Sequence, residues 1–277
     1  MIPESSLAAI RERMNTYGPK NCWTGATGTL AADVNRLLAE VARLKVENLR
    51  TGEAAMGRFL EIAMPYADDP MSMDVGHALM IGRFIREIDA TSVVEVGCAY
   101  GISTGAILDA FEERREGPFE LRQKKLLHLI DIKLQPSIWR MIERARHSLD
   151  VEIDYDQNPS LSKYQYDAAD VDHSTLGRCY GEVVILDGDH AEDTVMAEIE
   201  LILSWEKPPR AIILHDTGKV DGLPGPRAAV ERLRSKNWCV YHNETAGPRA
   251  SRGLTICVYD EFGDAASPAY RILELGK

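Results

Sequence analysis

Two short segments carry the acidic and histidine side chains best suited to catalysis in this 277-residue chain. They are Leu186-Asp187-Gly188-Asp189-His190 and Leu214-His215-Asp216-Thr217, and each includes or follows apolar residues typical of a buried parallel strand. Carboxylates that converge in one crevice repel each other and resist burial unless a cation or a proton lies between them. Asp oxygens suit Mg²⁺, and a bound Mg²⁺ can hold a hydroxyl and lower its pKa. The two segments therefore predict a metal-assisted site that acts on a hydroxyl group.

The same segments contain two candidates for a general base, Asp189 and His190. Histidine has the better unperturbed pKa for accepting a hydroxyl proton near neutral pH. His190 could equally cap the helix that follows it, and His215 could be a buried histidine whose hydrogen bonds are satisfied within the fold. We favour a functional role for Asp187 and Asp216.

A glycine-containing segment, Glu95-Val96-Gly97-Cys98-Ala99-Tyr100-Gly101, is the second candidate for ligand binding. Glycines let the backbone approach a ligand closely and take positive φ, and the N–H groups at the start of the following helix favour an anionic group. With Gly105, the spacing is G-x-x-x-G-x-x-x-G, which differs from the G-x-G-x-x-G of dinucleotide-binding folds. The carboxylate of Glu95 would repel a pyrophosphate. The segment therefore favours S-adenosylmethionine, which carries ammonium and sulfonium charges.

Asp131 ends the second predicted strand and is placed to accept hydrogen bonds from ribose hydroxyls. It lies farther from the glycines than the ~20 residues usual in dinucleotide-binding folds. The charged segment Glu112–Lys125, predicted as a solvated loop, accounts for the excess. Taken alone, Asp131 could also be a surface or helix N-terminal carboxylate.

Seven short apolar runs predict strands, and helical patterns separate the first five. The predicted strands are Ser92–Val96, Leu126–Ile130, Val151–Ile153, Val183–Leu186, Ala211–Leu214, Trp238–His242 and Leu254–Tyr259. The predicted helices are Asp74–Ile88, Ser103–Glu113, Pro136–Ser148, Asp193–Trp205, Pro226–Ser235 and a poorer one near Ala168–Leu176. This order predicts an α/β, doubly wound, Rossmann-like sheet that is mostly parallel. No helix fits between the last two runs, so they should form an antiparallel hairpin.

Residues 1–70 are predicted to form an N-terminal helical extension to a domain of residues 71–277. Within the extension, residues 29–49 show a heptad pattern with Val34 and Val41 at a and Leu37 and Leu44 at d. That combination favours a parallel two-stranded coiled coil, and hence a dimer or higher homo-oligomer. Packing of the same helix on its own domain is an equally good interpretation, because the pattern covers only about three heptads.

The composition excludes several classes of partner. The formal net charge of −11 argues against binding to nucleic-acid phosphates, which requires clustered Lys and Arg. Five cysteines without a C-x-x-C pair are typical of reduced thiols in a cytoplasmic protein. No apolar run approaches the ~20 residues of a membrane span, and the charged N-terminus lacks a signal-peptide pattern. We expect a cytoplasmic protein that acts on a small molecule.

The glycine segment and the residues before it resemble a known family. Met71–Leu79 (MSMDVGHAL), followed by VVEVGCAYGISTGAIL, looks like the lead-in and first motif of the cation-dependent O-methyltransferases, which are class I S-adenosylmethionine-dependent methyltransferases. The resemblance implies that Asp131 holds the ribose of the cofactor. The other residues expected to bind or adjoin the cofactor are Glu95, Gly97, Tyr100, Gly101, Ser103, Thr104 and Asp187.

The strings LDGDH and HDT resemble the small-molecule O-methyltransferases of antibiotic tailoring, including macrolide-sugar and aminocoumarin enzymes, and the cephalosporin-hydroxylase-like group. The similarity covers about Met71 to Tyr259. It implies that Asp187, His215 and Asp216 are metal ligands and that Asp189 is the general base. Those families commonly have an acid where this chain has His215, and imidazole suits a softer metal than Mg²⁺.

Three functions are compatible with these resemblances. The first is transfer of a methyl group from S-adenosylmethionine to a sugar or phenolic hydroxyl of a small natural product, assisted by a divalent cation such as Mg²⁺. The second is a partner subunit, similar to the cephalosporin-hydroxylase group, in an oxidation and methylation complex. The third is a non-catalytic dimer that binds the cofactor and supports another protein.

Overall fold

The structure, a computed structural model, describes residues 57–113, 124–157, 176, 180–244, 252–259 and 263–273. The chain divides into two compact units, Met1–Met56 and Gly57–Lys277. The expected domain of residues 71–277 with an extension over residues 1–70 stays a prediction. The predicted dimerisation helix over 29–49 lies outside the described residues, and so does the helical pattern near 168–176, apart from Leu176 itself.

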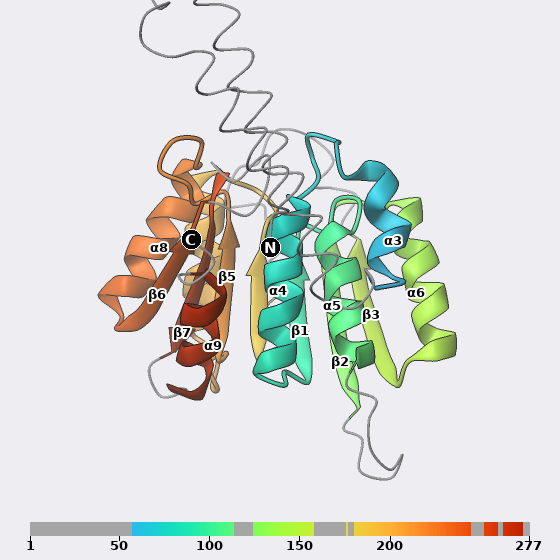
Figure 1. Cartoon of the computed structure of the whole chain (residues 1–277). Coiled ribbons are helices and arrows are strands. Elements are labelled where there is room, and N and C mark those ends of the chain that lie inside the picture. The colour runs from blue at the N-terminus through green and yellow to red at the C-terminus, as the bar shows by residue number, and fades with distance from the viewer. Residues whose placement is uncertain are drawn as a thin grey trace, which may run out of the picture. The chain divides into compact units, whose positions relative to one another are not determined.

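Within the described residues, seven strands form one sheet in the order β3-β2-β1-β4-β5-β7-β6 (Figure 1). The strands are β1 (Ser92–Val96), β2 (Lys125–Asp131), β3 (Val151–Gln157), β4 (Val183–Leu186), β5 (Ala211–His215), β6 (Trp238–Asn243) and β7 (Leu254–Tyr259). β1 to β5 run parallel, whereas β7 is antiparallel to both β5 and β6. The predicted α/β class and the terminal hairpin are confirmed, and the predicted bounds of β1, β4 and β7 agree with the structure.

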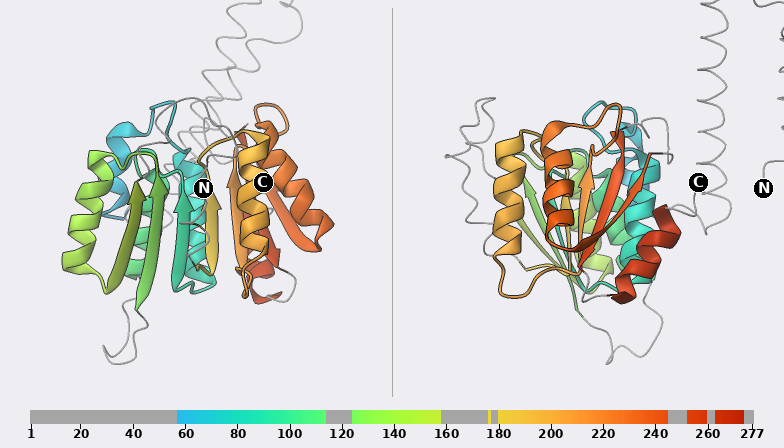
Figure 2. Two further views of the ribbon diagram at one scale, coloured as in Figure 1. Left: turned by 180° about the vertical axis from the view of Figure 1, so that it is seen from behind. Right: turned by 90° about the vertical axis from the view of Figure 1, so that its left-hand side faces the viewer.

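Helices cover both faces of the sheet (Figure 2). One face carries α3 (Leu60–Ala63), α4 (Val75–Glu87), α5 (Ile102–Glu113), α6 (Pro136–Ser148) and α9 (Gly263–Leu273). The opposite face carries α7 (Glu192–Leu203) and α8 (Pro224–Ser235), which pack against each other. A short 3-10 helix, η2 (Met64–Tyr66), follows α3. None of the described helices is both long enough and apolar enough to span a membrane.

Local sequence signals explain where several helices begin. The side chain of Asp74 accepts a hydrogen bond of 2.8 Å from the backbone N–H of Gly76 and so caps α4. Pro136 and Pro224 open α6 and α8, because the fixed φ of proline suits the first helical turn. α8 therefore begins two residues before the predicted start at Pro226. We did not predict α9, whose interior contains Pro268, a residue that normally disfavours a helix.

The parallel arrangement decides where a ligand can bind. β4 and β5 are buried along their whole length, as expected of parallel strands covered on both faces. Because β1, β2, β4 and β5 point the same way, the residues that follow them meet at one edge of the sheet. In open α/β sheets this carboxyl edge is the usual place for a ligand. All the predicted site residues lie at or next to this edge.

Candidate active site

The glycine loop, residues 97–101, connects β1 to α5 through three residues in the left-handed region. The angle φ is 82° at Gly97, 44° at Ala99 and 86° at Gly101. A Cβ on residue 97 would overlap the carbonyl oxygen of Asp187, so only glycine fits where the loops after β1 and β4 touch. The backbone N–H of Asp187 also donates to the carbonyl oxygen of Val96 at 2.9 Å. The predicted cofactor loop and the acidic segment are therefore in direct contact.

Asp131 fixes the shape of the glycine loop from the end of β2. Its Oδ2 accepts hydrogen bonds from the backbone N–H groups of Cys98 at 2.7 Å and Ala99 at 2.9 Å. On the other side, the hydroxyl of Ser137 donates to the carbonyl oxygen of Tyr100 at 2.6 Å. The loop is thus held in place by its own neighbours. The predicted contact between Asp131 and a ribose stays a prediction.

Glu95 lies beneath the glycine loop and is fully buried. Its two oxygens accept hydrogen bonds from the hydroxyls of Ser103 and Thr104, the latter at 2.7 Å. Burial raises the pKa of Glu95 to about 7, even though these hydroxyls oppose the shift. From the sequence we expected the charge of Glu95 to suit the cofactor; in the structure this carboxyl group is buried and ties β1 to α5. Direct contact of these three residues with a cofactor stays a prediction.

Tyr100, in the glycine loop, stacks on Tyr66 of η2. The ring centroids are 4.8 Å apart and the planes differ by 7°. The negative charge of Asp69 raises the pKa of the Tyr100 hydroxyl. Stacked rings of this kind offer a flat apolar surface with polar tips. Tyr66 was not among the predicted site residues, because nothing in the sequence next to it marks it as more than a loop residue.

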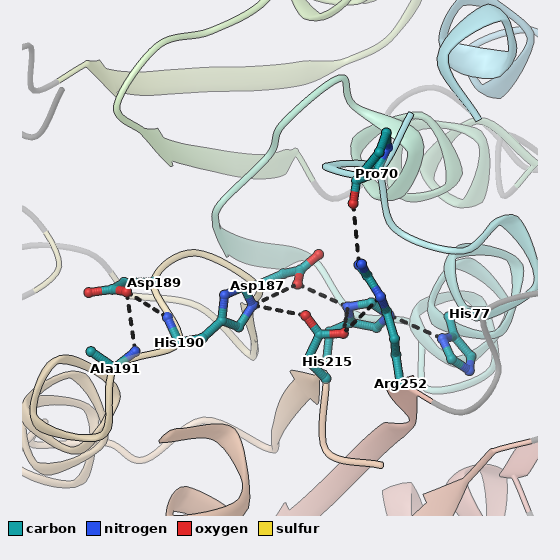
Figure 3. A network of polar contacts seen from close by, with 9 residues as sticks. Pro70, His77, Asp187, Asp189, His190, Ala191, His215 and Arg252 are labelled. Atoms are coloured by element: carbon teal, nitrogen blue, oxygen red, sulfur yellow. Dashed lines mark hydrogen bonds and ion pairs between the residues drawn. The ribbon is translucent and has the colours of Figure 1, made fainter. Parts of the chain in front are cut away.

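One polar cluster lies at the ends of β4 and β5 and consists of Asp187, His190, His215 and Asp216. Figure 3 labels the first three of these residues. The Nε2 atom of His190 lies 3.0 Å from Oδ2 of Asp216 and 3.7 Å from Oδ1 of Asp187. The Nδ1 atom of His215 lies 3.0 Å from Oδ1 of Asp187 and 3.4 Å from Oδ1 of Asp216. Asp216 has a φ of 55°, a left-handed conformation that Asp tolerates better than most residues. The fold thus brings the two chemically suited segments together.

Three residues of this cluster could share one metal ion. Single ligand atoms of Asp187, His190 and Asp216 all lie within 4.8 Å of one another. Two buried atoms here, Nε2 of His190 and Oδ1 of Asp216, have no hydrogen-bond partner among the described residues. The resemblance implied His215 as the third ligand, whereas this geometry favours His190.

Opposite charges within the cluster stabilise each other. Burial alone would lower the pKa of His190, but the carboxylates of Asp187 and Asp216 outweigh burial and raise it to about 10. Burial alone would raise the pKa of Asp187, yet His215 and His190 hold it well below its usual range. The carboxylate of Asp187 therefore stays ionised and attracts positive charge, which a protonated imidazole or a metal cation can supply.

His77 is a buried member of the site that we did not predict from the sequence. It lies on α4, and its Nδ1 is 3.2 Å from Nε2 of His215. Because a carboxylate only accepts, Nδ1 of His215 donates to Asp187, whereas either ring nitrogen can be the donor in the contact between His215 and His77. Burial, with a contribution from His215, lowers the pKa of His77 to about 4. A histidine on the otherwise apolar buried face of α4 was the available signal.

Asp189 lies outside the cluster and holds the turn before α7. Its Oδ1 accepts hydrogen bonds from the backbone N–H groups of His190 at 2.7 Å and Ala191 at 3.2 Å. Figure 3 shows Asp189 at the opposite end of the group of side chains from His77. Its Oδ2 is buried without a hydrogen-bond partner among the described residues. Its role as a general base stays a prediction.

Arg252 reaches the cluster from the residues before β7. Its Nε lies 3.8 Å from Oδ1 of Asp216, and its Nη1 donates to the carbonyl oxygen of Pro70 at 3.4 Å (Figure 3). Arg252 is thereby linked both to the end of β5 and to the segment that leads into α4. A partly exposed guanidinium therefore borders the site.

Comparison with known proteins gives matches at the level of three-dimensional structure. No protein-family model matches the sequence, and no curated protein matches it. An O-methyltransferase from Bacillus cereus in complex with SAH is similar with a TM-score of 0.57 and 13% identity, covering 82% of this chain and 100% of that one. The O-methyltransferase TomG from Streptomyces achromogenes, solved with SAM and involved in tomaymycin synthesis, has a TM-score of 0.55 and 13% identity, covering 81% and 97%.

A putative O-methyltransferase from Klebsiella pneumoniae is similar with a TM-score of 0.52 and 15% identity, covering 81% of this chain and 98% of that one. At this level of identity the likeness concerns the fold. Together with the strand order β3-β2-β1-β4-β5-β7-β6 and the antiparallel β7, it shows that the chain has the Rossmann-like α/β fold of the class I methyltransferases.

Proposed function

We propose that the chain is an S-adenosylmethionine-dependent O-methyltransferase that acts on a hydroxyl of a small molecule with the help of a divalent cation. The observation that carries this proposal is the contact between the glycine loop and the acidic cluster, through Gly97 and the backbone of Asp187. A group held by the loop and a group held by the cluster would be neighbours at the carboxyl edge. Placing two reactants side by side is much of what methyl transfer requires.

The glycine loop fits a cofactor with a nucleoside and an amino-acid end. Its left-handed residues Gly97 and Gly101 expose backbone rather than side chain, and Asp131 stands at the end of the neighbouring strand. The structures similar to this chain include one solved with SAM and one solved with SAH. When bound, S-adenosylmethionine supplies a methyl group on a positively charged sulfur. Glu95, Ser103 and Thr104 would support the loop from beneath, and the ring of Tyr100 would border the binding site.

The cluster fits a divalent cation. Asp187 and Asp216 would bind it, since their oxygens converge and Oδ1 of Asp216 is buried without a hydrogen-bond partner among the described residues. When bound, the cation would hold the hydroxyl oxygen of the acceptor and lower its pKa. Methyl transfer would break the carbon–sulfur bond, return its electron pair to sulfur and form a carbon–oxygen bond. The hydroxyl proton would pass to a base, for which Asp189 and His190 are the two candidates.

The acceptor proposed here is a sugar or phenolic hydroxyl of a small natural product. The stacked pair of Tyr66 and Tyr100 next to the loop supports a flat or ring-shaped acceptor. One of the structurally similar proteins, TomG, is involved in tomaymycin synthesis. Arg252 at the edge of the site would add a positive charge for a polar acceptor group.

Calorimetry and methyl transfer test this proposal in two steps. The full chain should bind S-adenosylmethionine, and it should transfer a labelled methyl group to members of a panel of sugars and phenols only when a divalent cation is present. A chain that does not bind S-adenosylmethionine contradicts the whole proposal. Methyl transfer that persists at full rate in the presence of a chelator removes the cation from the mechanism.

A further inference from the structure

The cluster at the ends of β4 and β5 combines two carboxylates with two imidazoles, and the imidazoles affect which cation the site prefers. We infer that the site takes a divalent transition metal in preference to Mg²⁺, with Nε2 of His190 as a ligand beside Asp187 and Asp216. This inference deepens the proposed function, on which it rests for its chemistry, by naming the class of cation. It also removes His190 from the candidates for the general base, because a nitrogen bound to a metal has no lone pair left to accept a proton.

The position of His190 carries the inference. Its Nε2 is buried and lies within ion-pair distance of Asp216 (3.0 Å) and Asp187 (3.7 Å), but neither contact has the geometry of a hydrogen bond. Oδ1 of Asp216, in a residue that is 3% exposed, is likewise buried without a hydrogen-bond partner among the described residues. A buried polar atom that makes no hydrogen bond costs free energy. A cation that accepts an electron pair from both atoms would satisfy them together.

The chemistry of the donors decides between classes of cation. Mg²⁺ binds oxygen almost exclusively, keeps several waters and demands near-octahedral geometry. Imidazole nitrogen suits ions such as Zn²⁺, Co²⁺, Ni²⁺ and Fe²⁺. Two carboxylates and one imidazole leave open positions at a transition metal for the hydroxyl of an acceptor. A donor set with one imidazole and two carboxylates therefore prefers Mg²⁺ less than a set of three carboxylates would.

A second layer of contacts fixes the carboxylate ligand. His215 donates from Nδ1 to Oδ1 of Asp187 at 3.0 Å, and its Nε2 is held by His77 at 3.2 Å. Hydrogen bonds of this kind set the orientation of a metal-binding carboxylate. His215 thus has both ring nitrogens occupied by neighbours, whereas His190 presents its Nε2 to the two carboxylates. This difference is why we assign His190 as the ligand and His215 as a positioning residue.

Metal titrations of the full chain test the inference. The chain is freed of metal with a chelator, and the affinities for Co²⁺ and Mg²⁺ are measured by calorimetry, with the visible absorption of Co²⁺ recorded in parallel. Co²⁺ should bind with about one equivalent and develop ligand-field bands. In His190→Asp, which makes the donor set all-oxygen, the ratio of Co²⁺ to Mg²⁺ affinity should fall at least about tenfold. In His190→Gln the Co²⁺ bands should weaken or disappear.

The matched control is His147→Asp, which makes the same replacement at an exposed position on α6 and should leave the ratio unchanged. Circular dichroism checks that each variant is folded. An unchanged affinity ratio in His190→Asp, or a Co²⁺ spectrum in His190→Gln identical to that of the parent chain, overturns the inference. Calorimetry with S-adenosylmethionine on the same preparation separates the two proposals. Failure to bind it contradicts the proposed function, whereas the metal ratio addresses the ligand assignment alone.

Discussion

His77 and His215 contact each other through ring nitrogens at 3.2 Å although 138 residues separate them in the sequence. The contact joins α4, which lies on one face of the sheet, to the end of β5. Through His215 it continues to Asp187 at 3.0 Å. The side chains of His77, His215 and Asp187 therefore connect α4 to the proposed catalytic edge. Removing the imidazole of His77 should change how His215 orients the carboxylate of Asp187.

Replacement of His77 by Leu should weaken metal binding about 10- to 100-fold, because His215 would lose the partner that orients it toward Asp187. The affinity for S-adenosylmethionine should stay nearly constant, since His77 does not contact the glycine loop in the described contacts. Co²⁺ titration and kcat at saturating cofactor measure the effect. His77→Gln, whose amide can still donate, should recover part of the loss. Metal affinity in His77→Leu equal to that of the parent chain would show that the contact serves packing alone.

Replacement of Asp216 by Asn should lower kcat for methyl transfer at least about 100-fold, because one of the two carboxylates that attract the cation is removed. Binding of S-adenosylmethionine should be retained. Initial rates with a labelled cofactor and calorimetry give the two quantities. Glu200→Gln on the exposed surface of α7 is the control, and it should leave both unchanged. Full turnover in Asp216→Asn would refute the assigned site.

Replacement of Asp131 by Ala should reduce the affinity for S-adenosylmethionine by about 10- to 100-fold. The N–H groups of Cys98 and Ala99 lose their acceptor, so the loop is less well preorganised, and the proposed ribose contact is lost as well. Calorimetry measures the change. Asp150→Ala, an exposed position between α6 and β3, should bind the cofactor normally. Equal affinities in the two variants would exclude Asp131 from the cofactor site.

Replacement of Gly97 by Ala should lower the free energy of unfolding by more than about 2 kcal/mol. An L-residue at φ of 82° is strained, and its Cβ would overlap the carbonyl oxygen of Asp187. Urea denaturation followed by circular dichroism provides the measurement. Gly188→Ala is the matched control, because its Cβ would approach Cγ1 of Val96 only to 3.3 Å, a contact that a small side-chain shift relieves. Similar losses in both variants would argue against a special role for the loop contact.

The pKa of Glu95 predicts a pH-dependent contribution to stability. Burial raises this pKa from 4.5 to about 7, so the folded state favours the protonated form. Protonated Glu95 therefore adds about 3 kcal/mol to the free energy of unfolding. This contribution is fully present below pH 4.5 and is lost as the pH rises to about 7. Glu95→Gln should remove this dependence. Its free energy of unfolding should therefore fall less than that of the parent chain between about pH 5 and about pH 7. Urea denaturation at several pH values measures the difference. Parallel stability curves for the two proteins would show that Glu95 does not titrate in this range.

The sequence by itself determined the order of the seven strands and of helices α4 to α8, and it gave the bounds of β1, β4 and β7. The alternation of apolar runs with helical patterns predicted the parallel strands β1 to β5, and the missing helix before Leu254 predicted the terminal hairpin. These predictions succeeded because they depend on local periodicity and on chain connectivity. The same local reasoning placed Gly97, Asp131, Asp187 and Asp216 at the ends of strands, and parallel strands necessarily end at one edge.

Only the tertiary structure decided which side chains meet at that edge and which are turned away. The carboxylate of Glu95 is buried against the hydroxyls of Ser103 and Thr104, because β1 packs against the start of α5. His190 points into the cluster whereas Asp189, its neighbour in sequence, holds the backbone of the following turn. His77 joins the site from α4. Such contacts depend on the packing of helices against the sheet and on single side-chain orientations, neither of which is encoded in local periodicity.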